Sequence, residues 1–212
     1  MSPEAVLKIG GSLSRGSGLA ALCESVSRLG ERHRLIVVPG GGAFADQVRQ
    51  AYRRYRLDET AAHRMALLAM DQYGYLLNHL ISGSCLKTDL QAPACEADSS
   101  VRILLPSALI FREDPLPHSW QVTSDTIAAW IAHSVQCRRL VLLKDVDGLM
   151  SSAGLIPELS VAQLSKHTGG VDEYFSQFLA TANLETWIIN GLHPERLGEL
   201  LRNGHAIGTV VR

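Results

Sequence analysis

The chain of 212 residues has the composition of an ordinary folded protein, with 46% hydrophobic and 19% charged residues. A chain of this length buries roughly 70% of the surface that it exposes when unfolded, so we expect a stable core. The net charge of −1 gives no general attraction for nucleic acid, and no apolar run approaches the roughly 18 residues that span a membrane. Nucleic-acid partners and membrane insertion are therefore not predicted.

The four cysteines, Cys23, Cys85, Cys95 and Cys137, lie far apart and form no C-x-x-C pair. This spacing predicts neither a zinc site nor a disulfide framework, and four reduced thiols are typical of the cytoplasm. The start of the chain also lacks the basic and long apolar regions of a secretory signal. We therefore expect a cytoplasmic protein in which no metal site is built from protein ligands alone.

The first half of the chain alternates predicted strands with predicted helices, and a glycine-rich turn follows each strand. The elements cover, in order, residues 5–9, 19–29, 35–38 and 43–55. Asp58 can then cap one long helix that runs to residue 80. Between residues 82 and 100 the periodicity fades, and we expect a loop that shapes or closes a substrate pocket.

The second half continues the alternation without a repeat or a linker. Its expected strands and helices cover residues 101–105, 123–135, 140–143, 161–166, 171–183, 187–189, 194–202 and 207–211. Such an order predicts an α/β fold, a three-layer αβα sandwich with a mostly parallel central sheet, formed as a single domain over residues 1–212. The active site is expected at the carboxyl ends of the strands.

Two glycine turns form a candidate phosphate cradle, Gly10-Gly11-Ser12 after the first strand and Gly40-Gly41-Gly42 after the second. Glycines let backbone N–H groups approach oxygens that a Cβ would keep away, and a helix that opens at such a turn adds a partial positive charge. Lys8, on the strand that enters the first turn, can stabilise charge on a transferring phosphoryl group. Because such turns are more often plain connections, neither predicts a function by itself.

Three carboxylates are expected near the same cleft. Asp125 lies in the first turn of a predicted helix, and Asp145 and Asp147 follow a predicted strand. They could orient Lys8 and hold Mg²⁺ through its waters. Each also has a structural interpretation, because an acidic residue in a first turn is commonly a cap and Asp147-Gly148 is a common turn.

A dinucleotide site is an alternative, because Gly40 to Ala45 loosely matches G-x-G-x-x-A. That interpretation predicts a nicotinamide-dependent dehydrogenase. Its acidic ribose ligand, expected about 20 residues later, would fall at Asp58 or Glu59, at the start of a helix and not at the end of a strand. The sequence contains no Walker A motif.

Taken in order, the motifs resemble those of the amino acid kinase family. They are Lys8-x-Gly10-Gly11-Ser12, Pro39-Gly40-Gly41-Gly42, Thr123-Ser124-Asp125, Lys144-Asp145-Val146-Asp147-Gly148, Asn190-Gly191 and Gly208-Thr209. The resemblance implies an αβα sandwich that transfers the γ-phosphoryl group of ATP, with Mg²⁺, to a small-molecule acceptor. It also implies an acceptor-binding half over about residues 1–115 and a nucleotide-binding half over about residues 116–212, and we expect a homo-oligomer.

The resemblance assigns a role to each motif residue. Lys8 would act on the transferring phosphoryl group, and Asp125 would organise the catalytic lysine or lysines. The phosphate-binding or acceptor-binding residues would be Gly10, Gly11, Ser12, Gly40, Gly41 and Gly42. The ATP site would be lined by Lys144, Asp145, Val146, Asp147 and Gly148.

One departure from the family pattern concerns a second phosphate-binding lysine, which many members carry on the helix after a Gly-Gly turn. Here Gly169-Gly170 is followed by Val171, and the nearest lysine is Lys166, before the turn. Either another cation replaces the lysine or the chemistry has changed. A non-catalytic nucleotide-binding or storage protein with the same fold therefore remains an alternative.

Residues 116–125, 170–175 and 190–197 resemble a narrower branch of the family, the kinases of methanofuran synthesis that convert (aminomethyl)furanmethyl phosphate into the diphosphate. Such an acceptor carries an ammonium group, for which we expect a carboxylate partner among Asp71, Asp172 and Glu173. Its phosphate would be bound by the glycine turns and Arg15. We expect Trp120 in the core and His63 in a structural role.

Overall fold

The computed structural model describes residues 2–90 and 101–212. Its main sheet is built from β1 (Ala5–Ile9), β2 (Leu35–Pro39), β3 (Cys85–Lys87), β4 (Val101–Leu104), β5 (Arg139–Lys144), β8 (Glu158–Leu159), β9 (Glu185–Asn190) and β10 (Thr209–Val211). The eight strands follow the order β3-β4-β2-β1-β5-β9-β10-β8, and among them only the pair β9 and β10 is antiparallel in the described part of the chain. The short strands β6 (Met150–Ser151) and β7 (Gly154–Leu155) form a separate hairpin.

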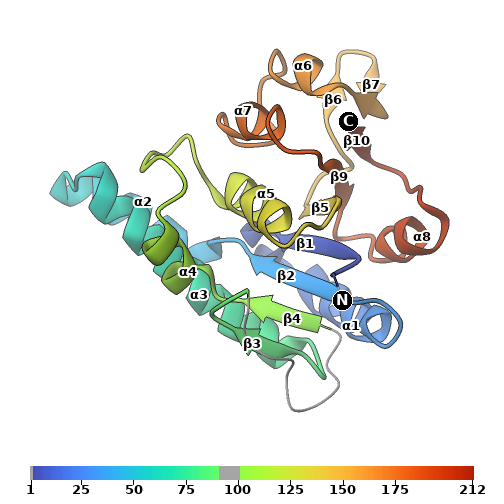
Figure 1. The fold of residues 1–212 in the computed structure, drawn as a ribbon, viewed down its shortest axis with the longest axis horizontal. Helices are drawn as coiled ribbons and strands as arrows, with labels where there is room; N and C mark the ends of the chain where they lie inside the picture. Colours follow the sequence, from blue (N-terminus) through green and yellow to red (C-terminus); the bar gives the residue numbers. More distant parts are fainter. Residues whose placement is uncertain (1, 91–100) are drawn as a thin grey trace.

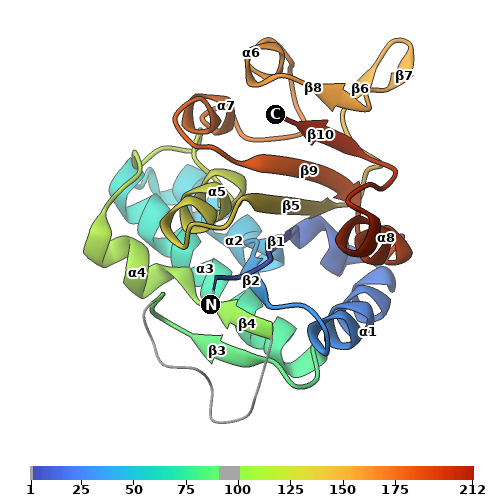
Figure 2. The ribbon, with the colours of Figure 1, turned by 45° about the vertical axis from the view of Figure 1, so that its right-hand side comes forward.

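Helices lie on both faces of this sheet (Figures 1 and 2). They are η1 (Gly11–Arg15), α1 (Gly18–Gly30), α2 (Gly42–Tyr55), α3 (Glu59–Leu80), α4 (Pro106–Glu113), α5 (Ser124–Ser134), α6 (Val161–Leu164), α7 (Phe175–Leu179) and α8 (Glu195–Asn203). The predicted αβα sandwich with a mostly parallel sheet is therefore confirmed.

Alternation along the buried strands divides the core into two layers. Val6 of β1 points into a cluster that contains Ile127 of α5 and Phe175 of α7. The next residue, Leu7, belongs to the opposite cluster, which contains Leu22 of α1 and Leu197 of α8. Because both faces of the central strands are covered, these strands are apolar throughout, as parallel strands between helical layers are.

The starts of the first helices follow from one capping residue and from the two glycine turns. Asp58 caps α3, where its Oδ1 accepts a hydrogen bond from the N–H of Ala61 at 2.7 Å, and the single long helix is confirmed. The second glycine turn opens α2 directly, at Gly42. The first turn opens only the short helix η1. The helix predicted over residues 19–29 is confirmed as α1, but it begins at Gly18 and not at the glycine turn itself.

Other differences from the prediction lie in short elements. Strands β3, β6, β7 and β8 and helix α4 were not expected, and the helix expected over residues 171–183 is reduced to α7. The expected pocket-shaping loop contains β3, while its residues 91–100 lie outside the described residues. Cys85 is disulfide-bonded, which contradicts the expectation of four reduced thiols, whereas Cys23 and Cys137 are free and buried.

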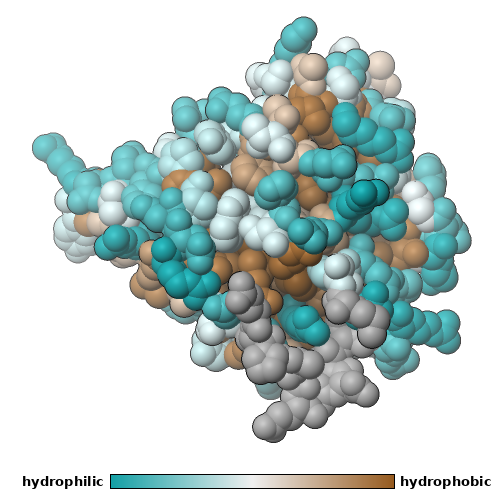
Figure 3. All heavy atoms as spheres, viewed as in Figure 1, coloured by the Kyte–Doolittle hydropathy of each residue, from teal (hydrophilic) through white to brown (hydrophobic). Residues whose placement is uncertain are grey.

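The surface of the described residues carries mixed polarity. On the face of Figure 1, hydrophobic residues gather towards the middle and hydrophilic residues occupy most of the rim (Figure 3). Within residues 2–90 and 101–212, no helix has both the length and the apolarity that crossing a membrane requires.

Candidate functional site

A polar cleft opens where β1, β2 and β5 end. These strands are parallel neighbours, so their carboxyl ends bring residues from distant parts of the sequence to one edge of the sheet. Most of the predicted site residues line the cleft. They are Lys8, Gly10, Gly11, Ser12, Gly41, Gly42, Asp125, Lys144, Asp145, Val146 and Asp172.

At the base of the cleft, Asp125 lies between two lysines. Lys8 Nζ lies 2.8 Å from Asp125 Oδ1, and Lys144 Nζ donates to Asp125 Oδ2 at 2.7 Å. Lys8 and Asp125 are only 5% and 3% exposed. A carboxylate shared by two ammonium groups leaves a net positive charge in a largely buried position, which is suited to an anionic ligand.

Burial and the neighbouring charges act differently on the pKa values of Asp125 and Lys8. Burial alone would raise the pKa of Asp125, but the charges of Lys8 and Lys144 outweigh it and lower the pKa to about 2. Burial lowers the pKa of Lys8, and the charge of Lys144 adds to this effect while Asp125 opposes it. Asp125 therefore remains a carboxylate, and its charge opposes the loss of the Lys8 proton that burial favours.

The two glycine turns touch each other at the cleft. A Cβ on Gly11 would lie 2.2 Å from the backbone nitrogen of Gly42, and Gly42 has a φ of +55°, in the left-handed region. Glycine at these two positions is therefore required for the turns to approach. The N–H groups of Gly10 and Gly40 donate to the carbonyls of Leu143 and Ile9, so these groups hold the turns against the sheet.

Asp172 lies in the cleft wall and caps α5. Its Oδ2 accepts from the N–H and hydroxyl of Thr123 and from the N–H of Thr126, and its Oδ1 accepts from the Thr126 hydroxyl. Burial and the nearby charge of Asp125 raise the pKa of Asp172, and these hydrogen bonds oppose the rise. Thr123, the N-cap residue of α5, makes no capping bond with its own side chain, so Asp172 supplies the acceptor from a distant part of the chain.

Only the first three residues of the predicted ATP-binding segment, Lys144 to Gly148, line the cleft. Lys144, Asp145 and Val146 line the cleft, and Asp145 Oδ1 accepts a hydrogen bond from Ser12 Oγ at 2.9 Å. Asp147 and Gly148 are not among the lining residues.

Asp147 instead binds Asn190 at the end of β9 and Arg196 in the first turn of α8. Its Oδ1 accepts from Asn190 Nδ2 at 3.0 Å and from Arg196 at 2.5 Å, and these hydrogen bonds lower the pKa of Asp147. Gly148, with a φ of +151°, packs against Thr209. Arg196 carried no sequence signal, since its partner lies 49 residues earlier.

Lys144 is a second lysine of the cleft, but it comes from the end of β5 and not from the segment after Gly169-Gly170. Gly170 lines the cleft, but Lys166 is exposed and does not line it. The side chain of Lys144, 16% exposed, instead lies beside Asp125. The cleft therefore has two lysines, of which one comes from the end of β5.

Asp71 is not brought to the cleft. It is half-buried on α3, and its two carboxylate oxygens accept hydrogen bonds from the N–H and the hydroxyl of Ser107, in the first turn of α4. Burial raises the pKa of Asp71, against the effect of these hydrogen bonds. Like Asp172, Asp71 caps a helix whose N-cap residue has no capping side chain of its own.

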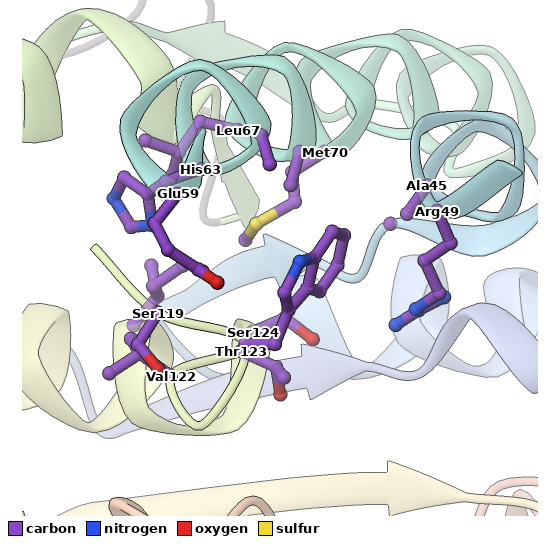
Figure 4. A pocket seen from close by; sticks show the side chains of 15 residues that line it. Ala45, Arg49, Glu59, His63, Leu67, Met70, Ser119, Val122, Thr123 and Ser124 are labelled. Carbon is purple, nitrogen blue, oxygen red and sulfur yellow. The ribbon is translucent and has the colours of Figure 1, made fainter. Parts of the chain in front are cut away.

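A second, apolar pocket adjoins the cleft (Figure 4). The two cavities share Gly41, Ala45, Arg49, Thr123 and Ser124. The further wall of the pocket comes from α3, from the segment before α5 and from α5 itself, and consists of Glu59, Ala62, His63, Ala66, Leu67, Met70, Ser119, Trp120, Val122 and Ile127. With a cavity volume of about 60 Å³, the pocket has room for several water-sized groups.

Two buried nitrogens of the pocket residues have no hydrogen-bond partner among the described residues, Nε1 of Trp120 and Nε2 of His63. Arg49 lies over the Trp120 ring, with its Cζ 5.4 Å from the ring centroid. Trp120 packs against the core, as predicted, and also lines the pocket. An unpartnered buried polar atom is uncommon in a native protein and indicates a missing ligand or water.

Comparisons with known proteins agree with this geometry. Residues 4–190 match the amino acid kinase family. A relative named [5-(aminomethyl)furan-3-yl]methyl phosphate kinase, from Methanocaldococcus jannaschii, is 27% identical over 210 residues, which cover 97% of this chain and 96% of the relative.

Solved structures show the same fold. Uridylate kinase from Archaeoglobus fulgidus superposes with a TM-score of 0.73 at 19% identity and full coverage of both chains. An isopentenyl phosphate kinase product complex from T. acidophilum has a TM-score of 0.62 at 19% identity, with 98% of this chain and 99% of that chain covered. With the family match over most of its length, the chain belongs to the amino acid kinase family and is a small-molecule kinase.

Proposed function

We propose that the protein transfers the γ-phosphoryl group of ATP to [5-(aminomethyl)furan-3-yl]methyl phosphate and so forms the diphosphate. The observation that carries the proposal is the continuity of the lysine-containing cleft with a small apolar pocket. The named substrate of the 27% identical relative has the two parts that these cavities suit, a phosphate and a small ring.

In the proposed reaction an oxygen of the acceptor phosphate forms a bond to the γ-phosphorus as the bond from that phosphorus to the β-phosphate oxygen breaks, releasing ADP. Negative charge then spreads over the transferring group. Lys8 and Lys144, fixed by Asp125, would stabilise that charge, as would the N–H groups of Gly11, Gly41 and Gly42. The contribution of the protein is positioning and electrostatics, without a covalent intermediate.

The acceptor phosphate would lie where the two cavities meet. Arg49 lines both, and Arg15 lines the cleft. Asp46 holds both guanidinium groups, with Arg49 Nη1 at 2.8 Å from Oδ1 and Arg15 Nη2 at 3.1 Å from Oδ2. Guanidinium groups bind phosphate through paired hydrogen bonds, so this junction suits an acceptor that already carries a phosphate.

Mg²⁺ would enter with the triphosphate. The described residues contain no cluster of three or more His, Cys, Asp or Glu that could hold a metal ion. Of the carboxylates that line the cleft, Asp125 is paired with lysines, Asp46 is paired with arginines and Asp172 caps α5. Asp145, which accepts one hydrogen bond from Ser12, is the carboxylate that would contact the ion or its waters. This fits Mg²⁺, which is commonly bound by substrate phosphates and one or two carboxylates and which neutralises phosphate charge.

We also propose that the predicted halves meet at the cleft, with the acceptor over about residues 1–115 and ATP over about residues 116–212. In support, α2 and α3, which belong to the first half, supply much of the apolar pocket. Lys144 to Val146, which belong to the second half, line the cleft. The segment from Ser119 to Ile127 lines the pocket as well, so the proposed acceptor site draws residues from both halves.

We propose that the active protein is a homo-oligomer; the cytoplasmic location expected from four reduced thiols loses that support, because Cys85 is disulfide-bonded. Large apolar side chains are exposed on α3 at helical spacing, at Met65, Leu68 and Leu76, and Phe111 of α4 is exposed as well. Such side chains are typical of surfaces that a second copy covers. Light scattering on the purified protein tests this point, and a monomer at micromolar concentration would contradict it.

The function is tested by mixing the protein with Mg-ATP and the acceptor and measuring ADP. We expect ADP in proportion to the acceptor, and much less with UMP, isopentenyl phosphate or acetylglutamate. ATP binding without ADP from any acceptor would favour the alternative, a non-catalytic nucleotide-binding protein. If another acceptor is phosphorylated and the furan is not, the proposed substrate is wrong but the proposed kinase activity is retained.

A further inference from the structure

The apolar pocket carries opposite charges at its two ends. Arg49 lies where the pocket meets the cleft, because it lines both cavities, whereas Glu59 lines the pocket alone. Figure 4 shows these two side chains on opposite sides of the pocket. A ligand with an anionic end beside Arg49 and a cationic end beside Glu59 would match this distribution of charge.

The position of Glu59 is fixed by α2. Arg49 and Tyr52 lie three residues apart on this helix, about 4.5 Å of helix rise. The Tyr52 hydroxyl donates to Glu59 Oε1 at 2.7 Å, and the Tyr52 ring packs edge-on against Trp120, with ring centroids 5.5 Å apart. The carboxylate of Glu59, an exposed residue, is therefore held by the side chain that lies about one helical turn beyond Arg49 on α2.

His63 adds an acceptor beside Glu59. The two residues lie one turn apart on α3, the spacing at which side chains share a helix face, and both line the pocket. His63 is 8% exposed, and its ring stacks on His118 with centroids 4.6 Å apart. Burial lowers the pKa of His63, so the imidazole is neutral near pH 7 and one of its ring nitrogens is an acceptor.

We propose that Glu59, together with His63, binds an ammonium group of the acceptor at the end of the pocket opposite Arg49. This inference rests on the proposed function, which assigns the acceptor phosphate to the cleft end. Between the two ends, Ala45, Ala66 and Met70 provide an apolar wall for a small ring. The unpartnered N–H of Trp120 suits an oxygen atom in such a ring.

The carboxylates that the sequence suggested for this role are less suitable. Asp71 accepts two hydrogen bonds from Ser107 and lines neither cavity, and the carboxylate of Asp172 caps α5. Glu173 lines neither cavity. Glu59 carried no such signal, because its role depends on the packing of α3 against α2.

The test compares two ligands and three variants by calorimetry. The ligands are [5-(aminomethyl)furan-3-yl]methyl phosphate and (5-methylfuran-3-yl)methyl phosphate, which lacks the amine. Glu59→Gln removes the charge but can still accept from Tyr52, His63→Phe keeps a ring but removes its nitrogens, and Glu31→Gln alters an exposed glutamate that lines neither cavity. Thermal melts establish that each variant is folded.

We expect Glu59→Gln to weaken the Kd of the amine ligand about tenfold or more and that of the amine-free ligand by less than about twofold. His63→Phe should show the same selectivity with a smaller change, and Glu31→Gln no change. Equal weakening of both ligands, no weakening by Glu59→Gln, or equal binding of both ligands to the unaltered protein would overturn the inference.

The same samples separate this inference from the proposed function. Selective binding of the amine ligand that depends on Glu59, without ADP formation, would keep the ammonium site and overturn the kinase reaction with this acceptor. Turnover of both ligands with equal KM would keep the reaction and overturn the ammonium site. If neither ligand binds, both proposals are wrong.

Discussion

The cleft and the apolar pocket are neighbours but differ in how they are built. At the base of the cleft, Lys8 and Lys144 come from strands and Asp125 from the first turn of α5, and the three are joined by ion pairs. The pocket is formed by the packing of α2 and α3 around Trp120, and two buried nitrogens in its wall have no partner among the described residues. The difference indicates that the cleft is preorganised for phosphate, whereas the pocket is completed by its ligand.

Lys8→Ala should have the largest effect. It removes the more buried of the two cations, and we expect kcat to fall by roughly a hundredfold to a thousandfold. The KM of the acceptor should change little, because Lys8 lines the cleft and not the pocket. Steady-state kinetics with the folded variant measure kcat and the acceptor KM. A kcat of Lys8→Ala equal to that of the wild type would show that Lys8 has no part in the mechanism.

Lys144→Ala should have the next largest effect, a fall in kcat of roughly tenfold to a hundredfold, because the remaining lysine still lies beside Asp125. Lys166→Ala is the matched control, since Lys166 is exposed and does not line the cleft. A loss with Lys166→Ala and none with Lys144→Ala would reverse the assignment of the second cation.

Ala66→Leu should affect the pocket alone. The added atoms would fill space that the acceptor ring needs, and we expect the acceptor KM to rise about tenfold while the KM of ATP stays the same. Ala20→Leu, at an exposed position on α1, is the control for a new leucine on a helix. An increase in the KM of ATP equal to that of the acceptor would argue against two separate subsites.

Asp71→Asn should have the smallest effect, on stability and not on binding. Asp71 caps α4 through Ser107, so we expect the free energy of unfolding to fall by about 1 kcal/mol and Tm by roughly 2–4 °C. The acceptor KM should not change. Weaker acceptor binding at unchanged Tm, in calorimetry and thermal melts, would return Asp71 to the acceptor site.

The elements around the cleft were predictable because their signals are local. An apolar run followed by glycines identified β1 and β2, and Asp58 with the periodic residues after it identified α3. Strands of two or three residues such as β3 and β8 have no periodicity to detect.

The capping roles of Asp71 and Asp172 and the pocket itself depend on contacts between distant residues, so they needed the structure. Asp172 and its partners Thr123 and Thr126 lie 49 and 46 residues apart, and Asp71 lies 36 residues before Ser107. Lys144 was assigned to the ATP site by position, but its contact with Asp125 could not be predicted, because it depends on how α5 packs beside β5.

The most direct test of phosphoryl transfer is the ³¹P NMR spectrum of the protein incubated with Mg-ATP and [5-(aminomethyl)furan-3-yl]methyl phosphate. We predict that the acceptor phosphate resonance is replaced by the coupled pair of a diphosphate as ADP forms, and that Lys8→Ala slows this conversion about a hundredfold or more. Formation of ADP with inorganic phosphate and an unchanged acceptor resonance would contradict it.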